Sequence, residues 1–482
     1  GKIEEFRISH TFGIDPLQQY LVPFPDGRLQ ALGLAWDTRP LEQGGQRWFH
    51  LYPDESIDYQ DELHWTGPQQ NWNYMCADCH STNLVKGYDA ENDEFNTTWS
   101  EISVGCESCH GPGARHVDWA KANEQDPEVQ AGNDAGPVDE SDAADFGLEV
   151  VQRDRRGAAW AFTNDNGIAA RTIPRESSNE IEVCATCHSR RGTLRSGAGA
   201  KASFLDYHMP AFLTEPLYHV DGQIRDEVYV WGSFLQSKMH QEGVTCSDCH
   251  DPHSGNLRVA GDDICATCHL PERFATTSHH GHSEESAGAD CLACHMPTET
   301  YMVVDPRRDH SLRPPRPDLS LLYGTPNACN QCHDGESVKW AADAFSKMFP
   351  DASRPFQHWT GAFRQARENK PQAEVSLLRV IEADGTPDLV RATALIELTD
   401  QMGPLSRSVL AKSLNDPNGL VRIAALRALE ALPPENRLVL GQSALEDPLL
   451  AVRVEAGRVL GVAPPESLPE ARRQALRDAL ME

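Results

Sequence analysis

The sequence predicts a mainly α-helical protein in which a region with little regular secondary structure precedes an α-solenoid. Three observations lead to this prediction. A five-residue cysteine motif recurs between Cys76 and His333, no cysteine follows, and the sequence from Glu336 onward is rich in Ala, Leu and Arg with a regular repeat. The predicted parts are an N-terminal cap at 1–75, a motif-bearing domain at 76–335 and a helical repeat domain at 336–482.

The first 75 residues contain no cysteine and are rich in aromatic and turn-forming residues. The segment from Pro23 to Gly27 is typical of a turn, and apolar and polar residues alternate between Leu29 and Leu34. Such spacing indicates short strands joined by loops. We therefore expect a partly β cap over the start of the motif-bearing domain.

The recurring motif is C-x-x-C-H, which occurs seven times and uses all 14 cysteines of the chain. Its cysteine pairs are Cys76 and Cys79, Cys106 and Cys109, Cys184 and Cys187, Cys246 and Cys249, Cys265 and Cys268, Cys291 and Cys294, and Cys329 and Cys332. The histidines that end the motifs are His80, His110, His188, His250, His269, His295 and His333.

This motif is the attachment site of c-type haem, because its two thiols can bond the vinyl groups of one porphyrin and its histidine can bind the iron. Zinc sites combine cysteine or histidine pairs but do not need a histidine directly after each second cysteine. A disulfide framework does not need one either. The pattern therefore predicts seven covalently attached haem c groups, each with its motif histidine as the proximal iron ligand.

The fourth, fifth and sixth motifs are the most closely spaced, since they start at Cys246, Cys265 and Cys291. So little protein separates them that we expect their three haems to lie in contact or nearly so.

Thirteen of the 20 histidines lie outside the motifs, and a low-spin electron-transfer haem needs a sixth ligand. The histidines that we expect as distal iron ligands are His50, His64, His116, His219, His253, His280, His282 and His310. His253 and His116 follow His250 and His110 too closely to reach the opposite face of the same porphyrin, so we expect each to bind the iron of a neighbouring haem. The alternative for each of these residues is an ordinary surface or hydrogen-bonding histidine.

A 31-residue repeat marks the C-terminal part of the chain, where Val-Arg pairs begin at Val390, Val421 and Val452 and are followed by Ala and Leu at matching positions. A fixed period with small residues at helix contacts is typical of helical solenoids, here similar to HEAT-type repeats. An ordinary helical bundle is the alternative. Because this part contains no cluster of Cys, His or acid–base residues, we expect its exposed face to bind protein.

Three stretches, Cys106–Gly113, Cys246–His253 and Cys291–Pro297, resemble multihaem cytochromes of the hydroxylamine oxidoreductase and cytochrome c nitrite reductase lineage. More closely, residues 6–333 resemble bacterial proteins that join such a haem domain to C-terminal helical repeats. The resemblance implies closely packed haems and a periplasmic or extracellular location. Those relatives carry a further haem motif upstream. All seven motifs here end in histidine, so the lysine-ligated haem of the nitrite reductases is absent.

The net charge of −29 disfavours nucleic acid as a partner, since its phosphates would be repelled. The sequence contains no run of 18 or more apolar residues, so we expect no transmembrane helix. We expect an exported electron carrier that passes electrons to redox proteins or to other copies of itself. One alternative is an enzyme that reduces or oxidises a small nitrogen or sulfur compound at one open haem. Another is a subunit of a polymeric extracellular filament.

Overall fold

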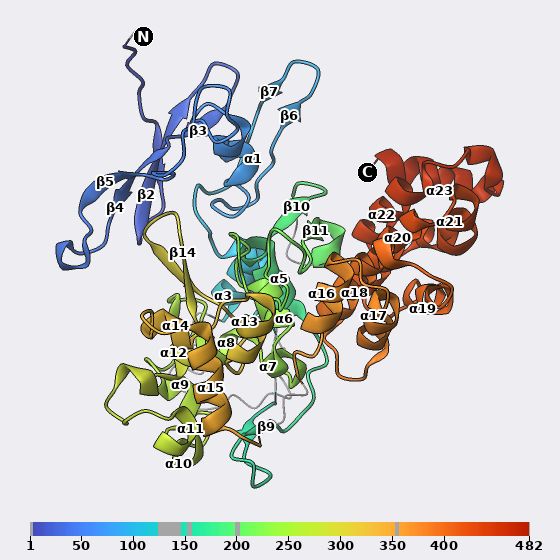
Figure 1. Cartoon of the computed structure of the whole chain (residues 1–482). Coiled ribbons are helices and arrows are strands. Elements are labelled where there is room, and N and C mark those ends of the chain that lie inside the picture. The colour runs from blue at the N-terminus through green and yellow to red at the C-terminus, as the bar shows by residue number, and fades with distance from the viewer. Residues whose placement is uncertain are drawn as a thin grey trace. The chain divides into compact units, whose positions relative to one another are not determined.

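The computed structural model describes residues 3–123, 146–150, 152, 157–197, 203–351 and 356–481. Helices predominate in it, accompanied by several small antiparallel sheets (Figure 1). The chain divides into two compact units. The first unit comprises 1–151, 195–202 and 299–307, and the second comprises 152–194, 203–298 and 308–482.

The largest sheet lies in the first unit and has the strand order β1-β2-β4-β5, with β3 paired to β2. Its strands are β1 (His10–Phe12), β2 (Leu17–Pro23), β3 (Leu29–Ala31), β4 (Leu34–Asp37) and β5 (Arg47–His50). Alternation along β2 buries Leu17 and Leu21. Leu21 packs in one apolar cluster with Trp72 and Ala77, so the first cysteine motif lies directly beside the core of this sheet.

The remaining strands form two-stranded hairpins between the motifs. They are β6 (Tyr88–Asp89) with β7 (Glu94–Phe95), β8 (Trp160–Ala161) with β9 (Ala170–Arg171), β10 (Arg191–Thr193) with β11 (His208–Pro210), β12 (His250–Asp251) with β13 (Asn256–Leu257), and β14 (Thr298–Tyr301) with β15 (Asp305–Arg308).

The helices of the motif-bearing segments are short. They are α1 (Trp72–Met75), α2 (Glu107–His110), α3 (Ala114–Ala122), α5 (Asn179–His188), α6 (Trp231–Leu235), α7 (Lys238–Gln241), α8 (Cys246–Cys249), α9 (Asp263–Ala266), α10 (Pro271–Phe274), α11 (Thr277–His280), α12 (Cys291–His295), α13 (Pro317–Tyr323) and α14 (Cys329–Cys332). Most span a single turn or little more, because the chain between motifs offers few apolar residues for a longer buried face.

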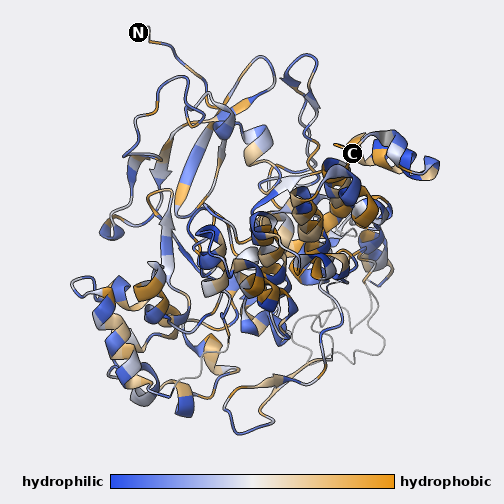
Figure 2. Ribbon diagram, turned by 45° about the vertical axis from the view of Figure 1, so that its right-hand side comes forward, coloured by the Kyte–Doolittle hydropathy of each residue, from blue (hydrophilic) through white to orange (hydrophobic). Residues whose placement is uncertain are grey.

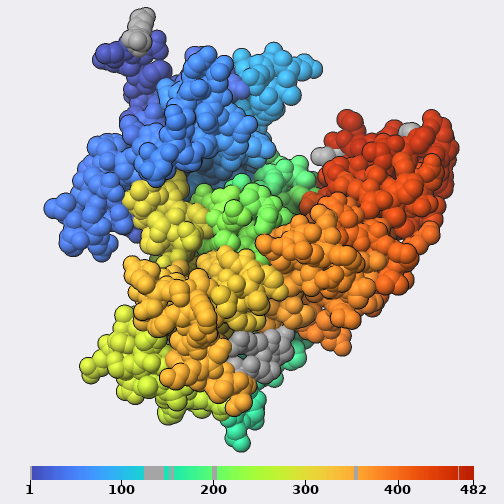
Figure 3. Space-filling view, in the orientation of Figure 1, coloured from blue at the N-terminus to red at the C-terminus, as the bar shows by residue number. Residues whose placement is uncertain are grey.

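The C-terminal helices are longer; the first of them packs on α13 and α14, and the others pack on one another. They are α15 (Val338–Met348), α16 (Thr360–Arg367), α17 (Ala373–Glu382), α18 (Asp388–Leu398), α19 (Ser406–Ser413), α20 (Gly419–Ala428), α21 (Pro434–Gly441), α22 (Leu450–Leu460) and α23 (Glu470–Met481). We call α16 to α23 the helical array. In the space-filling view its residues form one continuous packed body, coloured orange to red (Figure 3).

The 31-residue repeat corresponds to a repeated packing pattern. Val390, Val421 and Val452 lie on α18, α20 and α22, and all three are 0% exposed. Consecutive members of this helix series contact each other. Hydrophobic and hydrophilic residues share each of these helices (Figure 2). The three valines therefore line an apolar interior, as their shared register predicts.

Ion pairs repeat with the same period. Arg391 pairs with Asp416, and Arg422 makes a bidentate pair with Asp447 through N–O distances of 2.8 and 3.0 Å. In both cases the arginine of one repeat binds the aspartate in the turn before the next repeat. The sequence spacing thus sets both the apolar core and the polar contacts between repeats.

The helical array shares its unit with the third to seventh motifs, and hydrogen bonds join these two regions. Trp359 Nε1 donates to Asp221 O at 3.2 Å, and the backbone N–H of Leu450 donates to Asp206 Oδ1 at 2.9 Å. The predicted boundary at 335/336 therefore remains a prediction. No helix in the described ranges has the length and hydrophobicity needed to cross a membrane.

Candidate haem-binding centres

Each cysteine motif occupies a single tight or helical turn. In the fifth motif the backbone N–H groups of Cys268 and His269 donate to Cys265 O at 3.1 and 2.8 Å. All 14 cysteines lie within the described residues, and none of them forms a disulfide. The turn keeps both thiols and the histidine of one motif close together, which suits attachment to one porphyrin.

Three motif histidines in the second unit each face another histidine. His250 faces His310, with ring centroids 6.3 Å apart and an interplanar angle of 26°. His295 faces His279 at 6.1 Å and 17°. His333 faces His282 at 6.1 Å and 24°.

These separations fit one iron between two imidazoles. An axial nitrogen lies about 2 Å from a bound metal and about 1 Å from its own ring centroid, so two axial rings on one metal have centroids roughly 6 Å apart. An offset pair of aromatic rings can have the same separation. The repeated choice of histidine opposite a motif histidine favours shared ligation over simple packing.

Hydrogen bonds to Nδ1 fix the tautomer in members of all three pairs. Nδ1 of His295 donates to Arg313 O at 2.9 Å, and Nδ1 of His310 donates to Arg308 O at 2.9 Å. Nδ1 of His282 donates to His280 O at 2.6 Å. A carbonyl oxygen only accepts, so Nδ1 carries the proton and the Nε2 lone pair is left for a metal, which is the arrangement usual for ligating histidines.

Burial favours the neutral form of four of the paired histidines. It lowers the pKa of His250, His279, His295 and His310, because a charged imidazolium is poorly solvated away from water. Neutral imidazole is the form that binds a metal. The environment of these pairs therefore suits axial ligation.

The first unit holds the first two motif histidines. His80 lies against the ring of Phe12, and burial lowers its pKa. Nδ1 of His110 donates to Val150 O at 3.3 Å, the same kind of contact as in the second unit. His116 also donates from Nδ1, to Phe146 O at 2.7 Å, while its ring lies nearly parallel to that of Trp119.

Most of the expected distal ligands fall into two groups: those that face a motif histidine, and those whose Nδ1 accepts a backbone N–H. His282 and His310 lie opposite motif histidines. His50 and His280 instead accept backbone N–H groups at Nδ1, from Tyr52 and His282 respectively, which places the proton of the neutral ring on Nε2. Nδ1 of His64 likewise accepts a long contact from the backbone N–H of Thr66, at 3.4 Å.

His253 and His219 belong to neither group. His253 is exposed in the turn between β12 and β13. His219 is partly buried within the second unit, and that burial lowers its pKa. Iron ligation by either residue remains a prediction.

His279 faces a motif histidine, although sequence reasoning ranks it only as a reserve ligand. It lies in the run His279-His280-Gly281-His282, and its neighbour His280 was preferred. Helix α11 ends at His280, and Gly281 follows in the left-handed conformation (φ 74°). This turn brings His279 and His282 to two different motif histidines, which spacing alone does not reveal.

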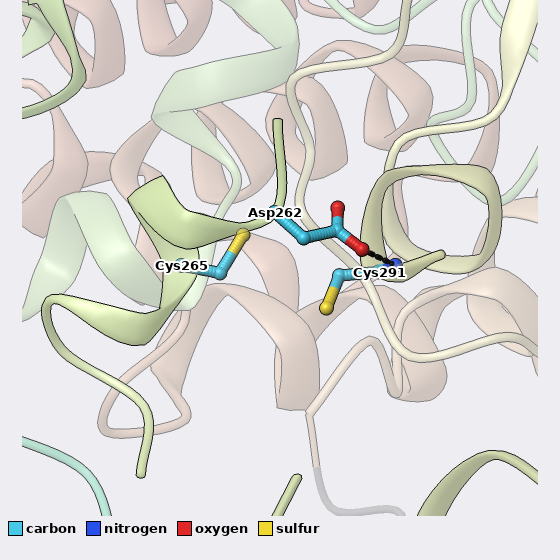
Figure 4. A group of neighbouring side chains, drawn as sticks. All are labelled: Asp262, Cys265 and Cys291. Atoms are coloured by element: carbon cyan, nitrogen blue, oxygen red, sulfur yellow. Dashed lines mark hydrogen bonds between the residues drawn. The ribbon is translucent and has the colours of Figure 1, made fainter. Parts of the chain in front are cut away.

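Sulfur atoms of consecutive motifs also meet. The Cys184 thiol hydrogen-bonds to Cys246, which raises the pKa of Cys184. Cys265 and Cys291 lie together with the Asp262 carboxylate, their ligand atoms within 4.8 Å of one another (Figure 4). Burial and the Asp262 charge raise the pKa of Cys291 to about 12.

The group of Asp262, Cys265 and Cys291 is the only one among the described residues that could hold a metal ion directly. It takes one cysteine from each of two complete C-x-x-C-H motifs. A metal site here would therefore split both motifs, whereas haem attachment uses each motif whole.

Two protein-family models match parts of the chain. One describes cytochrome c554 and c-prime and matches residues 46–111, and the other describes a doubled CXXCH motif and matches residues 239–274. No curated protein matches the sequence. The crystal structure of the outer cell wall cytochrome OcwA is similar at 14% identity, over 87% of this chain and 86% of that chain, with a TM-score of 0.45. Together with the seven motifs, the two family models support a multihaem c-type cytochrome with covalently bound haem c.

Proposed function

We propose that this protein carries electrons along a row of seven closely spaced c-type haems between redox partners. The observation that supports it most strongly is the set of three histidine pairs, because two imidazoles that held one iron between them would leave no position on it for a substrate. When bound, haem supplies one-electron iron chemistry.

The residues of the chain have distinct tasks in this proposal. The 14 cysteines attach the porphyrins and the seven motif histidines are proximal ligands. His310, His279 and His282 are the distal ligands that face His250, His295 and His333. Backbone carbonyls accept the Nδ1 protons of His282, His295 and His310, which fixes the tautomer and orientation in which these three rings would bind iron.

Contacts between motifs support transfer in chain order within the second unit. The third motif touches the fourth through Cys184 and Cys246, and the fifth touches the sixth through Cys265 and Cys291. Burial and the neighbouring Cys329 of the seventh motif raise the pKa of Cys294 in the sixth motif, so these sites are also close. Such spacing favours electron hopping from the third haem to the fourth, and from the fifth through the sixth to the seventh.

The location and partners are parts of the same proposal. Covalent attachment of haem takes place outside the cytoplasmic membrane, which favours a periplasmic or extracellular protein. The net charge of −29 favours partners with basic surfaces. The helical array would dock a partner protein, since among the described residues it contains no candidate metal site.

The test is the ligand field of every haem in the purified protein. Pyridine haemochrome analysis is expected to count seven covalent haems, and low-temperature magnetic circular dichroism should find bis-histidine low-spin iron in at least three. A clearly smaller count, or high-spin iron throughout the second unit, would overturn the proposal.

A second candidate function is reduction or oxidation of a small nitrogen or sulfur compound at one open haem. The observation in its favour is a partly buried polar pair before the fourth motif, where Arg175 Nη2 lies 3.1 Å from His240 Nε2. Burial lowers the pKa of His240 to about 3. An arginine and a neutral histidine could bind an oxyanion. One high-spin haem that binds nitrite or sulfite in the native protein would support this function.

A further inference from the structure

Two pairs of consecutive motifs in the second unit have their first cysteines in contact. One pair is the third and fourth motifs, through Cys184 and Cys246, and the other is the fifth and sixth, through Cys265 and Cys291. The first cysteine of every motif bonds the equivalent corner of its own porphyrin. Each contact would therefore bring equivalent corners of two porphyrins close together.

A carboxylate from the earlier motif reaches the later one in both pairs. Asp262 comes directly before α9, and its Oδ2 accepts the backbone N–H of Cys291 at 2.7 Å (Figure 4). Glu180 lies in the first turn of α5 and is 4% exposed. Its Oε1 accepts the backbone N–H of Ser247 at 2.6 Å, and its Oε2 accepts the Ser247 hydroxyl at 2.9 Å.

Ordinary helix capping does not account for these bonds. Helix α12 has its own cap, since the Asp290 side chain accepts from the backbone N–H of Ala293. Helix α8 has a capping box formed by Thr245 and Asp248. Asp262 and Glu180 therefore bind further N–H groups at helix starts that are already capped from within their own segments.

We propose that Glu180 and Asp262 are positioning residues that clamp the motifs into two contact pairs of haems, third with fourth and fifth with sixth. This inference rests on the proposed function, because it requires a haem at each of the four motifs. Each clamp joins the start of one motif helix to the start of the next and so sets the gap that an electron crosses. Each also places a negative charge beside a haem pair, which favours the oxidised irons.

The experiment compares pairs of variants in the full-length holoprotein. Asp262→Ala removes the acceptor, whereas Asp262→Asn keeps an amide oxygen for Cys291 N–H and removes only the charge. Glu180→Ala and Glu180→Gln make the same comparison at the other pair. Asp263→Ala is the matched control, since Asp263 is exposed on the same helix as Cys265. The readouts are haem count, exciton splitting in Soret circular dichroism, and spectroelectrochemical midpoint potentials.

Both alanine variants should lower the exciton splitting, and the double variant should lose the sum of the two, because the clamps act on separate pairs. Asp262→Asn and Glu180→Gln should keep the splitting of the native protein and shift two potentials upward. Asp263→Ala should change neither quantity.

The clamp proposal is wrong if either alanine variant keeps the native splitting, or if the amide variants lose as much as the alanine variants. If one alanine variant fails to fold, the alanine and amide variants at the other clamp still test the proposal. A native protein without haem at these motifs would instead overturn the proposed function, so the two failures are distinguishable.

Discussion

The helical array and the segments that carry the third to seventh motifs lie in one compact unit but are stabilised in different ways. The array buries its own apolar side chains, as the fully buried Val390, Val421 and Val452 show. The motif segments have single-turn helices, two-residue hairpin strands and cysteines that remain partly accessible or exposed. Where side chains complete the core, the fold is a property of the chain alone. Where we expect porphyrins to complete it, the fold should depend on the attached haem.

The largest expected effect follows from preventing haem attachment. In a chain with all motif cysteines replaced by serine, the segment 157–335 should become highly sensitive to proteases, because a large part of its apolar core would be missing. The helical array should remain resistant. Limited proteolysis followed by mass spectrometry would reveal this, and equal resistance of the two regions would contradict the distinction drawn here.

A cavity in the helical array should have a smaller effect, but it should still lower the free energy of unfolding strongly. Leu426 is fully buried on α20, so Leu426→Ala is expected to lower the free energy of unfolding by about 2–5 kcal/mol. Leu405 is largely exposed, and Leu405→Ala should change stability by less than about 0.5 kcal/mol. Chemical denaturation followed by far-ultraviolet circular dichroism compares them, and similar losses would show that α20 does not lie in the core.

The ion pairs between repeats should contribute less than the core. Arg422 and Asp447 are both largely buried and joined by two hydrogen bonds, so Arg422→Met is expected to cost about 1–3 kcal/mol. The pair of Lys339 and Asp343 on α15 is exposed, and Lys339→Met should cost no more than about 0.5 kcal/mol. Thermal unfolding of both variants would show which ion pair contributes more to stability. A larger loss of stability for Lys339→Met than for Arg422→Met would contradict this prediction.

The smallest expected effect is a pH dependence in the N-terminal sheet. Asp37 is fully buried, and its hydrogen bond with Arg39 lowers the carboxyl pKa. A lowered pKa in the folded state stabilises the protein above the unfolded value of about 3.9, and this contribution is lost as pH falls through the folded value. Asp37→Asn should flatten the stability profile between pH 5 and pH 3, as measured by denaturant titration. An unchanged profile would show that Asp37 does not contribute to the pH dependence of stability.

The sequence predicted the parts of the molecule that depend on local spacing. The 31-residue register placed three valines on one interior, and the C-x-x-C-H turn placed both thiols beside a histidine. Distal ligands were harder to predict, because His310 lies 60 positions after His250 and reaches it only through the fold. His253 is near in sequence but exposed. The contacts of Asp262 with Cys291 and of Glu180 with Ser247 likewise arise only when two motif helices meet.

The most direct test of the central claim is the spin state of iron in variants of the facing histidines. His279→Ala, His282→Ala and His310→Ala should each keep seven covalent haems, and each should convert one low-spin haem to high-spin iron in the electron paramagnetic resonance spectrum. The triple variant should show three such haems, and His358→Ala, an exposed residue remote in sequence from the motifs, should show none. If all three single variants keep the native low-spin spectrum, these histidines are not iron ligands and the proposed row of six-coordinate haems is wrong.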